Sequence, residues 1–508
     1  MYNIIRIPDE YRIEYGTEGE QGAQLRFEMG EGLKIFLSAI SCSVKYVRLR
    51  WREKTEGPCR ILGDDWERLY GMAEWRGIVA ERLMPWYVLI SREQGVQGIG
   101  VKVRPSAMCH WQVDRGGITL VLDVRSASEG VVLDGRELLA AEVVSRFYEN
   151  VSEFEASKQF CRLMSDSPVL PDEPVYGSNN WYYAYGKSSH DEILGDSAFV
   201  SSLTEGLKNR PWMVVDDGWS PLATCGPWHI GNERFPDMAR LAREMKEIGV
   251  KPGIWFRPLF DDSPFSAHGH TLADVPHTLD PTDPAVLQYV SETVARIKDW
   301  GFGLIKHDFS SFDIGGAWGS AGRRSFVVEG RRFGDRTKTT AEVVKTLYRT
   351  IYDSADGMLI LGCNCLNHLC AGYAHINRVG DDTSGQNWER TRRMGINALA
   401  FRLCQDESFF KVDADCVGLT AQVPWEKNRQ WLDLLARSGT PLFVSAKISD
   451  VTEDMKAALR DAFAMAAVQE TGCEPLDWLD NTTPAEWKFG SDVQMYDWDD
   501  VVGVDRDV

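Results

Sequence analysis

The feature that most constrains the fold is a regular alternation of short apolar runs and amphipathic segments that begins near residue 172. Between the runs lie segments with helical periodicity, and several of these end in Gly, as helices commonly do. The eight apolar runs cover residues 175–185, 212–219, 251–259, 301–309, 357–365, 376–382, 408–415 and 440–446. Eight strands that alternate with helices match the strand count and the size of a (β/α)8 TIM barrel.

A doubly wound α/β sheet alternates in the same way, but it normally carries a Gly-rich phosphate-binding turn after a strand. Neither G-x-G-x-x-G nor G-x-x-x-x-G-K-[ST] opens any of the helical segments in this chain. The sequence therefore favours the barrel. In a barrel of this kind the active site is expected at the carboxyl ends of the strands.

The residues before the barrel have a different character. Short runs rich in Val, Ile, Leu and Tyr, such as residues 33–40, are separated by turn residues and indicate antiparallel strands. We therefore expect an antiparallel β-sandwich domain over residues 1–172, joined by the proline-rich stretch 168–174 to a catalytic barrel over residues 173–470. Residues 471–508 are too few for a full domain and predict a short C-terminal β segment.

Composition and charge exclude several classes of protein. The 508-residue chain is 44% hydrophobic and 26% charged, which is enough for a sizeable core, and its formal net charge of -19 disfavours nucleic-acid and anionic-membrane partners. It has no apolar run of about 18 residues and no basic segment followed by an apolar one at its N-terminus, so neither a transmembrane helix nor a signal peptide is expected. The 11 scattered cysteines favour reduced thiols in a cytoplasmic protein over a disulfide framework.

Acidic side chains follow four of the eight predicted strands. They are Asp216 and Asp217 after the second strand, Asp308 at the end of the fourth, Asp381 and Asp382 after the sixth, and Asp413 and Asp415 after the seventh. Because the carboxyl ends of barrel strands meet on one face, these carboxylates are expected to converge, with Lys306, Arg378 and Arg257 placed to offset their charge. Taken singly, each Asp is as easily a helix N-cap; their recurrence on four strands favours a site.

Two converging carboxyl groups are the equipment of glycoside hydrolysis. In retaining enzymes they lie about 5–5.5 Å apart, one acting as nucleophile and the other as acid/base. Lys306 and Asp308 occupy alternate positions of one strand and therefore share a face, where the ammonium group is expected to keep the carboxyl ionised. Asp216 and Asp217 can accept hydrogen bonds from adjacent sugar hydroxyls, and the nearby Trp and Tyr residues offer flat faces to a ring, although Trp in a barrel is more often part of the core.

Six groups of motifs occur in a fixed order between about Tyr176 and Lys447. They are NNWYYAYG; VVDDGW with GPWHIGNERFPDM; KPGIWF; LDPTDPAVLQYV with GLIKHDFS; RVGDD; and VDADCVGL with GTPLFVSAK. In this order they resemble the α-galactosidase (melibiase) clan of retaining glycoside hydrolases, whose larger members have an N-terminal β-domain followed by a (β/α)8 barrel. DDGW alone is a modest signal, whereas the ordered set is specific.

The resemblance implies a retaining exo-α-glycosidase, α-galactosidase-like, that works by double displacement through a covalent glycosyl-enzyme. Asp308 would be the nucleophile with Lys306 as its charge partner, and Asp382 the acid/base, oriented by Arg378. The substrate-binding residues implied are Trp181, Asp216, Asp217, Trp255, Lys306, Cys363, Asn364, Arg378 and Asp415. Neither a metal nor an organic cofactor is implied, and the expected partner is a carbohydrate. An N-terminal β-domain of this kind often assists assembly, so a homo-oligomer is compatible with the resemblance.

The chain departs from the family pattern close to the expected site. After the third strand it has WFRPL, with Arg257, where larger members have an acidic WFEPE-like segment. After the fifth strand GCNCLNHLC, with Cys363, Asn364 and His368, replaces the family's pattern in the region that contacts the 2-position of the sugar. The sequence therefore leaves the sugar open between galactose, N-acetylgalactosamine, a pentopyranose such as arabinose and a gluco-configured sugar. The short C-terminus is a third departure.

Three other functions stay open at this stage. A transglycosylase would use the same chemistry with a sugar as the acceptor. A non-catalytic sugar-binding barrel would be expected to lack one of the two carboxylates, and both are present. A metal-dependent hydrolase would need a complete set of metal ligands. Neither His268 and His270, which lie in a loop, nor the incomplete cluster of Cys363, Cys365 and Cys370 supplies one.

Overall fold

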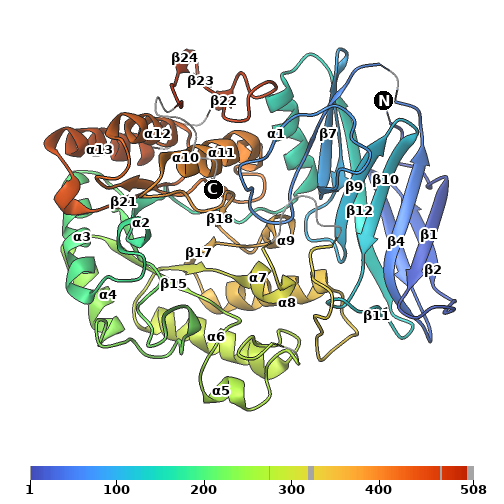
Figure 1. Ribbon diagram of the computed structural model, residues 1–508, viewed down its shortest axis with the longest axis horizontal. Coiled ribbons are helices and arrows are strands. Elements are labelled where there is room, and N and C mark those ends of the chain that lie inside the picture. The colour runs from blue at the N-terminus through green and yellow to red at the C-terminus, as the bar shows by residue number, and fades with distance from the viewer. Residues whose placement is uncertain (1, 56, 274, 319–324, 469–471, 500–508) are drawn as a thin grey trace.

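The computed structural model describes residues 2–55, 57–273, 275–318, 325–468 and 472–499. Figure 1 shows an antiparallel β-sandwich on the right, a barrel of parallel strands surrounded by helices on the left, and a small C-terminal sheet at the top. Among the helices in these residues, none is both long and apolar enough to cross a membrane.

Two antiparallel sheets form the N-terminal sandwich. The first contains β1 (Glu10–Tyr15), β4 (Ser43–Arg52), β10 (Gly117–Asp123), β9 (Met108–Asp114) and β6 (Met84–Pro85) in this order, with β11 (Val131–Val132) beside β4. The second contains β2 (Gln24–Met29), β3 (Leu33–Ser38), β12 (Glu137–Tyr148), β8 (Gly95–Val101), β7 (Tyr87–Arg92) and β5 (Arg60–Gly63). Along β3, Leu33, Ile35 and Leu37 are fully buried while Lys34 is exposed, because successive side chains of a strand point to opposite faces. The predicted sandwich is confirmed.

The barrel sheet has nine parallel strands in eight positions. They are β13 (Tyr176–Asn179), β14 (Trp212–Val215), β15 (Lys251–Phe256), β16 (Leu304–His307), β17 (Leu359–Gly362), β18 (Ile376–Arg378), β19 (Lys411–Asp413), β20 (Val417–Leu419) and β21 (Leu442–Ala446). The seventh position is divided, since β19 pairs with β18 and β20 pairs with β21, which closes the ring. Asp415 lies in the break with φ 77°, a left-handed conformation that interrupts regular pairing. Each expected apolar run contains a strand, and the predicted TIM barrel is confirmed.

Long helices cover the outside of the barrel, except α1, which packs against β8 and β12 of the sandwich, and shorter helices lie in the loops. The helices longer than eight residues are α1 (Glu153–Met164), α3 (His190–Leu203), α4 (Met238–Ile248), α6 (Pro284–Asp299), α8 (Thr340–Ala355), α12 (Trp425–Arg437) and α13 (Glu453–Ala466). The short ones are α2 (Trp181–Ala184), η1 (Ala223–Cys225), α5 (Pro264–Ala267), α7 (Ser310–Gly315), α9 (Asn367–Cys370), α10 (Trp388–Thr391), η2 (Arg392–Ile396), α11 (Asn397–Arg402), η3 (Leu403–Gln405) and η4 (Ile448–Asp450). Local sequence sets their ends: Thr339 and Glu342 form a capping box at the start of α8, and Gly249 ends α4 with φ 100°.

The C-terminal segment forms a three-stranded antiparallel sheet from β22 (Cys473–Pro475), β23 (Glu486–Phe489) and β24 (Asp492–Met495). It is held against α12 by the Tyr496 hydroxyl, which donates to Asp433 at 2.6 Å. The short β segment expected from the sequence is therefore present, and residues 500–508 of that expectation lie outside the described residues. The exact domain bounds at residues 172 and 470 stay predictions.

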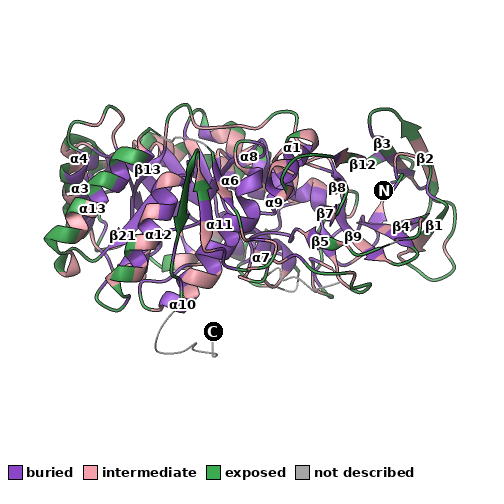
Figure 2. Ribbon diagram, turned by 90° about the horizontal axis from the view of Figure 1, so that it is seen from above, coloured by how far each residue is buried: buried purple, intermediate pink, exposed green. Residues whose placement is uncertain are grey.

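The sandwich and the barrel share one hydrophobic core. Trp86 of the sandwich stacks on His368 of the barrel with ring centroids 5.2 Å apart, and Figure 2 shows buried residues on both sides of this junction. Residues 64–83, an insertion between β5 and β6, extend from the sandwich and make a second contact with the barrel. The Leu69 N–H donates to the Val379 carbonyl at 2.7 Å, so this insertion reaches the loop after β18. It thereby reaches the carboxyl face of the barrel.

Candidate active site

A cavity opens where the carboxyl ends of the barrel strands meet. It is lined by Arg68, Trp181, Asp216, Asp217, Thr224, Trp255, Lys306, Asp308, Phe309, Trp318, Asn364 and Asp382. The structure thus brings together most of the side chains expected from the sequence. Arg378, Asp415 and Cys363 are buried behind this lining and do not form part of it. The expected face of the barrel is therefore the face that carries the cavity.

Asp308 follows the last residue of β16 and is held by three donors. Its Oδ2 accepts the indole N–H of Trp255 at 2.9 Å. Its Oδ1 accepts the backbone N–H of Phe309 at 2.6 Å and a hydrogen bond from the side-chain amide of Asn364. These contacts from β15, β16 and the loop after β17 fix the orientation of the carboxylate, and among the described residues Oδ2 has one donor.

The sequence analysis expected Lys306 to pair with Asp308, and this prediction is wrong. Lys306 Nζ lies 2.7 Å from Asp216 Oδ2. Alternation along β16 does place Lys306 and Asp308 on the same face, but the long lysine side chain reaches across the barrel to the end of β14. Burial alone would lower the pKa of Lys306, but Asp216 outweighs it and raises this pKa well above its ordinary value. Lys306 is therefore a charged donor in the cavity.

Asp217 has the most unusual ionisation of the lining carboxyls. Its Oδ1 accepts the backbone N–H of Gly218 at 2.7 Å, while the adjacent Asp216 is the carboxylate that pairs with Lys306. Burial, followed by repulsion from the charge of Asp216, raises the pKa of Asp217 to about 7. Near neutral pH this group can therefore change between a donor and an acceptor.

Asp382, in the loop after β18, has the opposite environment. Its Oδ1 lies 2.8 Å from Arg378 Nη2 and 3.8 Å from Arg68 Nη1, while its side chain stays 38% exposed. Burial would raise the pKa of Asp382, but the two guanidinium groups outweigh it and hold this pKa well below its usual range. Asp382 is therefore ionised in the free protein.

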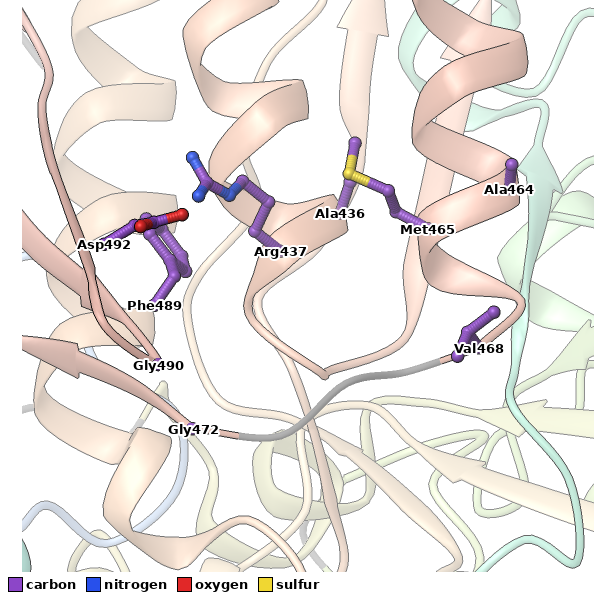
Figure 3. A pocket seen from close by; sticks show the side chains of 9 residues that line it. All are labelled: Ala436, Arg437, Ala464, Met465, Val468, Gly472, Phe489, Gly490 and Asp492. Carbon is purple, nitrogen blue, oxygen red and sulfur yellow. The ribbon is translucent and has the colours of Figure 1, made fainter.

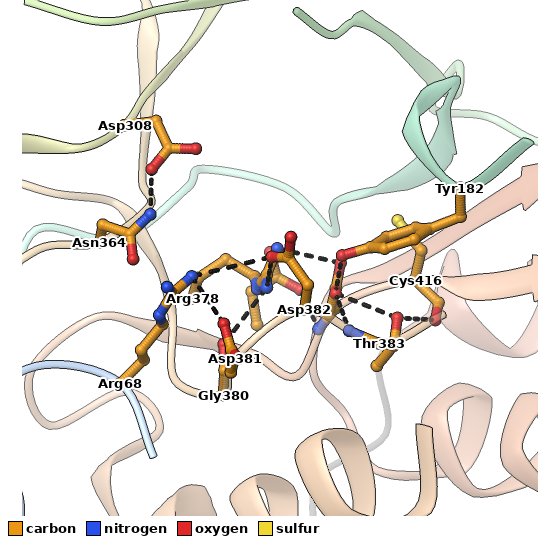
Figure 4. A network of polar contacts seen from close by, with 12 residues as sticks. Arg68, Tyr182, Asp308, Asn364, Arg378, Gly380, Asp381, Asp382, Thr383 and Cys416 are labelled. Atoms are coloured by element: carbon orange, nitrogen blue, oxygen red, sulfur yellow. Dashed lines mark hydrogen bonds and ion pairs between the residues drawn. The ribbon is translucent and has the colours of Figure 1, made fainter. Parts of the chain in front are cut away.

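Behind the cavity, Arg378 connects Asp382 to the divided seventh strand (Figure 4). Arg378 Nη1 lies 3.1 Å from Asp415 Oδ1. Asp415 also accepts hydrogen bonds from the Tyr182 hydroxyl and, at 2.8 Å, from the Thr383 N–H. Its left-handed backbone turns the carboxylate toward these partners, so Asp415 supports the site from behind the lining.

Arg257 and Asp381 differ from their expected surroundings. The Arg257 guanidinium donates to Asp313 of α7, with Nε 2.9 Å from Oδ2, and lies 4.3 Å from the Phe309 ring centre. It therefore pairs with an acid outside the lining, whereas the sequence analysis expected it to offset the charge of the strand-end carboxylates. Asp381 pairs with Arg68 at 3.0 Å and with Arg390 at 2.8 Å, and it does not form part of the cavity lining.

Four lining residues were not expected from the sequence: Arg68, Thr224, Phe309 and Trp318. Phe309 adjoins a predicted residue, and the other three come from loops with no strand-end signal. The Arg68 guanidinium lies over the Trp318 ring at 4.6 Å, and Trp318 packs on Phe309 with ring centroids 5.1 Å apart. An aromatic and cationic rim therefore borders the cavity on the side of the sandwich.

The described residues hold no group of three or more His, Cys, Asp or Glu side chains arranged to bind a metal ion. His270 pairs with Asp283 at 2.7 Å and stacks on Phe265. Cys363 and Cys365 are buried free thiols. Both candidate metal patterns in the sequence therefore have other surroundings within this part of the chain.

A second hollow lies between α12, α13 and the C-terminal sheet (Figure 3). Among the described residues its lining contains one carboxylate, Asp492, and also Arg437, whose guanidinium lies 4.1 Å from the Phe489 ring centre. Arg437 is at the C-terminal end of α12, where the chain has returned to the amino ends of the strands. This hollow is therefore remote from the convergent carboxylates.

No family model matches the chain. Among solved structures, it is similar to the α-galactosidase of Thermus thermophilus in complex with p-nitrophenyl alpha-D-galactopyranoside, at 17% identity and a TM-score of 0.65, covering 96% of this chain and 99% of that one. The fold is that of GH36 α-galactosidases. The GH36 α-galactosidase AgaA of Geobacillus stearothermophilus gives 14% identity and a TM-score of 0.61 over 94% of this chain and 76% of that one. The α-galactosidase of Lactobacillus brevis gives 13% identity and a TM-score of 0.59, over 90% of this chain and 70% of that one.

Proposed function

We propose that this chain is a retaining exo-α-glycosidase of the α-galactosidase type. The observation that carries the proposal is that Asp308 and Asp382 line one cavity in different environments, the first held by neutral donors and the second by guanidinium groups. Two carboxyl groups with separate roles are what double displacement requires. The shared fold with α-galactosidases supports the same reaction class.

In the first step Asp308 Oδ2 attacks the anomeric carbon, because within the described part of the chain this oxygen accepts one hydrogen bond, from the Trp255 N–H, and keeps a free lone pair. Because Asp382 is ionised in the free protein, it must take up a proton from solvent before this step; it transfers that proton to the leaving oxygen as the carbon–oxygen bond to the aglycone breaks. In the second step ionised Asp382 removes a proton from water, which attacks the anomeric carbon and releases Asp308. The two guanidinium groups beside Asp382 stabilise the ionised form that this second step uses.

Sugar recognition is assigned to the remaining lining groups. Asp216, Asp217 and Lys306 supply two acceptors and one donor along one edge of the cavity, which suits adjacent hydroxyls. Trp181 provides a flat wall. Asn364 Oδ1 is buried and has no hydrogen-bond partner among the described residues, so it can accept a hydrogen bond from the hydroxyl next to the anomeric carbon. Similar structures hold p-nitrophenyl alpha-D-galactopyranoside and stachyose, which makes galactose the first sugar to test.

Wild-type protein should hydrolyse one member of a panel of p-nitrophenyl α-glycosides, with the α-galactoside first among them, and should release the α anomer of the sugar. The reason is that two successive inversions at the anomeric carbon give net retention. Time-resolved proton NMR of the product checks this before mutarotation. Initial release of the β anomer would overturn the retaining mechanism, and folded protein that turns over no member would overturn the proposed activity.

The affinity for the released sugar should depend on pH through Asp217. Below pH 7 this carboxyl is protonated in the free protein and can no longer accept from two hydroxyls, so the Kd should rise by up to about tenfold per pH unit as the pH falls. Calorimetric titration from about pH 5 to about pH 8, which brackets the pKa of about 7, measures this. The Asp217→Asn variant should bind weakly and without this dependence; if it keeps the dependence, the assignment to Asp217 is wrong.

A further inference from the structure

The loop that carries Asp382 is held by the sandwich as well as by the barrel. Its strand, β18, ends at Arg378. Beyond that residue, the Leu69 N–H donates to the Val379 carbonyl at 2.7 Å, and the Asp381 N–H donates to the Leu69 carbonyl at 2.8 Å. The insertion therefore forms an isolated parallel β-bridge, between Leu69 and Gly380, with the loop immediately before Asp382.

Buried polar contacts anchor this insertion on the barrel. Asp64 pairs with Arg402 at 2.7 Å, and both side chains are almost completely buried. The Glu67 carboxylate accepts hydrogen bonds from the hydroxyls of Tyr70 and Ser311. Buried charges are tolerated only when they are paired, so these contacts strongly favour one placement of the insertion.

Between these anchors the insertion directs Arg68 at the acid/base loop. Arg68 Nη1 lies 3.0 Å from Asp381 Oδ1 and 3.8 Å from Asp382 Oδ1, and the side chain is 6% exposed. Its guanidinium lies over the rings of Trp318 and Tyr70, at 4.6 and 5.5 Å, which restricts its motion. Asp382 thus stands between Arg378 of the barrel and Arg68 of the sandwich.

We propose that Arg68 is a positioning residue for Asp382, supplied by the N-terminal sandwich, which holds this carboxyl at the geometry needed for proton transfer to the leaving group. The inference rests on the proposed function, because it assigns a partner to the acid/base of that reaction. It explains why a segment so far from the barrel strands in sequence lines the cavity. It also makes the sandwich part of the catalytic apparatus.

The test compares two substrates that differ in their need for acid catalysis. A phenyl α-galactoside needs its leaving oxygen protonated, whereas a 2,4-dinitrophenyl α-galactoside does not. Arg68→Gln should lower kcat/KM for the phenyl substrate by roughly 10- to 100-fold, the cost of a misplaced proton donor, and change it little for the dinitrophenyl substrate. Equal losses on both substrates would indicate a merely structural role and overturn the inference.

A double-mutant cycle with Asp382→Ala gives the second readout. If Arg68 acts through Asp382, Arg68→Gln should cost nothing further on the phenyl substrate in the Asp382→Ala background, whereas additive losses overturn the inference. Arg68→Lys keeps the charge but loses the planar guanidinium group. It should lower kcat/KM less than Arg68→Gln does, with the same difference between the two substrates. It replaces Arg68→Gln in the double-mutant cycle if the Gln variant does not fold.

Arg390→Gln is the matched control. Arg390 pairs with Asp381 at 2.8 Å, as Arg68 does, but its side chain is 32% exposed and lies outside the cavity lining. This change should alter both substrates equally and less than threefold, within about 0.6 kcal/mol. If wild type cleaves neither substrate, the proposed function fails; if wild type is active and Arg390→Gln matches Arg68→Gln in its substrate pattern, the inference alone fails.

Discussion

Replacing Asp308 with Ala should lower kcat for an aryl α-galactoside on the order of 10⁴- to 10⁶-fold, because the covalent route loses its nucleophile. The truncation leaves a space bordered by Trp255 and Asn364, the two side chains that donate to the carboxylate. Azide can enter this space and attack the α-glycoside from the face that Asp308 used. Added azide should therefore restore part of the activity and yield the β-glycosyl azide, identified by NMR.

Asp308→Asn is the control for this rescue. It should be as inactive as the Ala variant, but the amide keeps the volume of the carboxylate and leaves no room for azide. Rescue of both variants, or formation of the α-glycosyl azide by the Ala variant, would mean that Asp308 is not the nucleophile. Residual activity near that of wild type in either variant would lead to the same conclusion.

Asp382→Ala should show the complementary pattern. Loss of the acid/base should lower kcat/KM roughly 10²- to 10⁴-fold for substrates whose leaving group needs a proton, and far less for a dinitrophenyl leaving group. With the dinitrophenyl substrate the glycosyl-enzyme still forms but waits for a base. Azide needs no base, so it should accelerate turnover and yield the α-glycosyl azide, the opposite anomer from that of Asp308→Ala.

The two azide products together identify the roles without reference to any other protein. A β product from Asp382→Ala would mean that azide replaces this residue as nucleophile and that the two assignments must be exchanged. Loss of activity that is equal for good and poor leaving groups would remove Asp382 from proton transfer. Arg378→Lys is a further check, since it keeps the charge beside Asp382 but loses the guanidinium bond at 2.8 Å.

Most of the barrel and much of its cavity were open to prediction because their signals are local. An apolar run bounded by helical periodicity determines a strand, and the residue after the run lies at the carboxyl end of the barrel wherever the strand sits in the ring. Asp216, Asp308 and Asp382 could therefore be assigned to one cavity. The cytoplasmic location has no such local signal and stays a prediction, and the homo-oligomer that the resemblance left open is likewise untested.

Which of those side chains form ion pairs with one another could not be predicted from the sequence. Lys306 and Asp308 share a face of β16, yet the lysine pairs with Asp216, because a long side chain reaches across a barrel as easily as along a strand. Arg257 likewise pairs with Asp313 of a short helix that the alternation did not predict. Register determines which side chains meet in a cavity, but it does not determine which of them form ion pairs.

The sequence by itself determined the barrel, the sandwich before it and the two carboxyl groups, Asp308 and Asp382, that line the cavity. Only the tertiary structure decided that the sandwich reaches this cavity, through the insertion that carries Arg68. The physical reason is the range of the information: periodicity and strand-end position are properties of neighbouring residues. The contact between Arg68 and Asp382 instead depends on how two separately patterned domains pack, which no local pattern records.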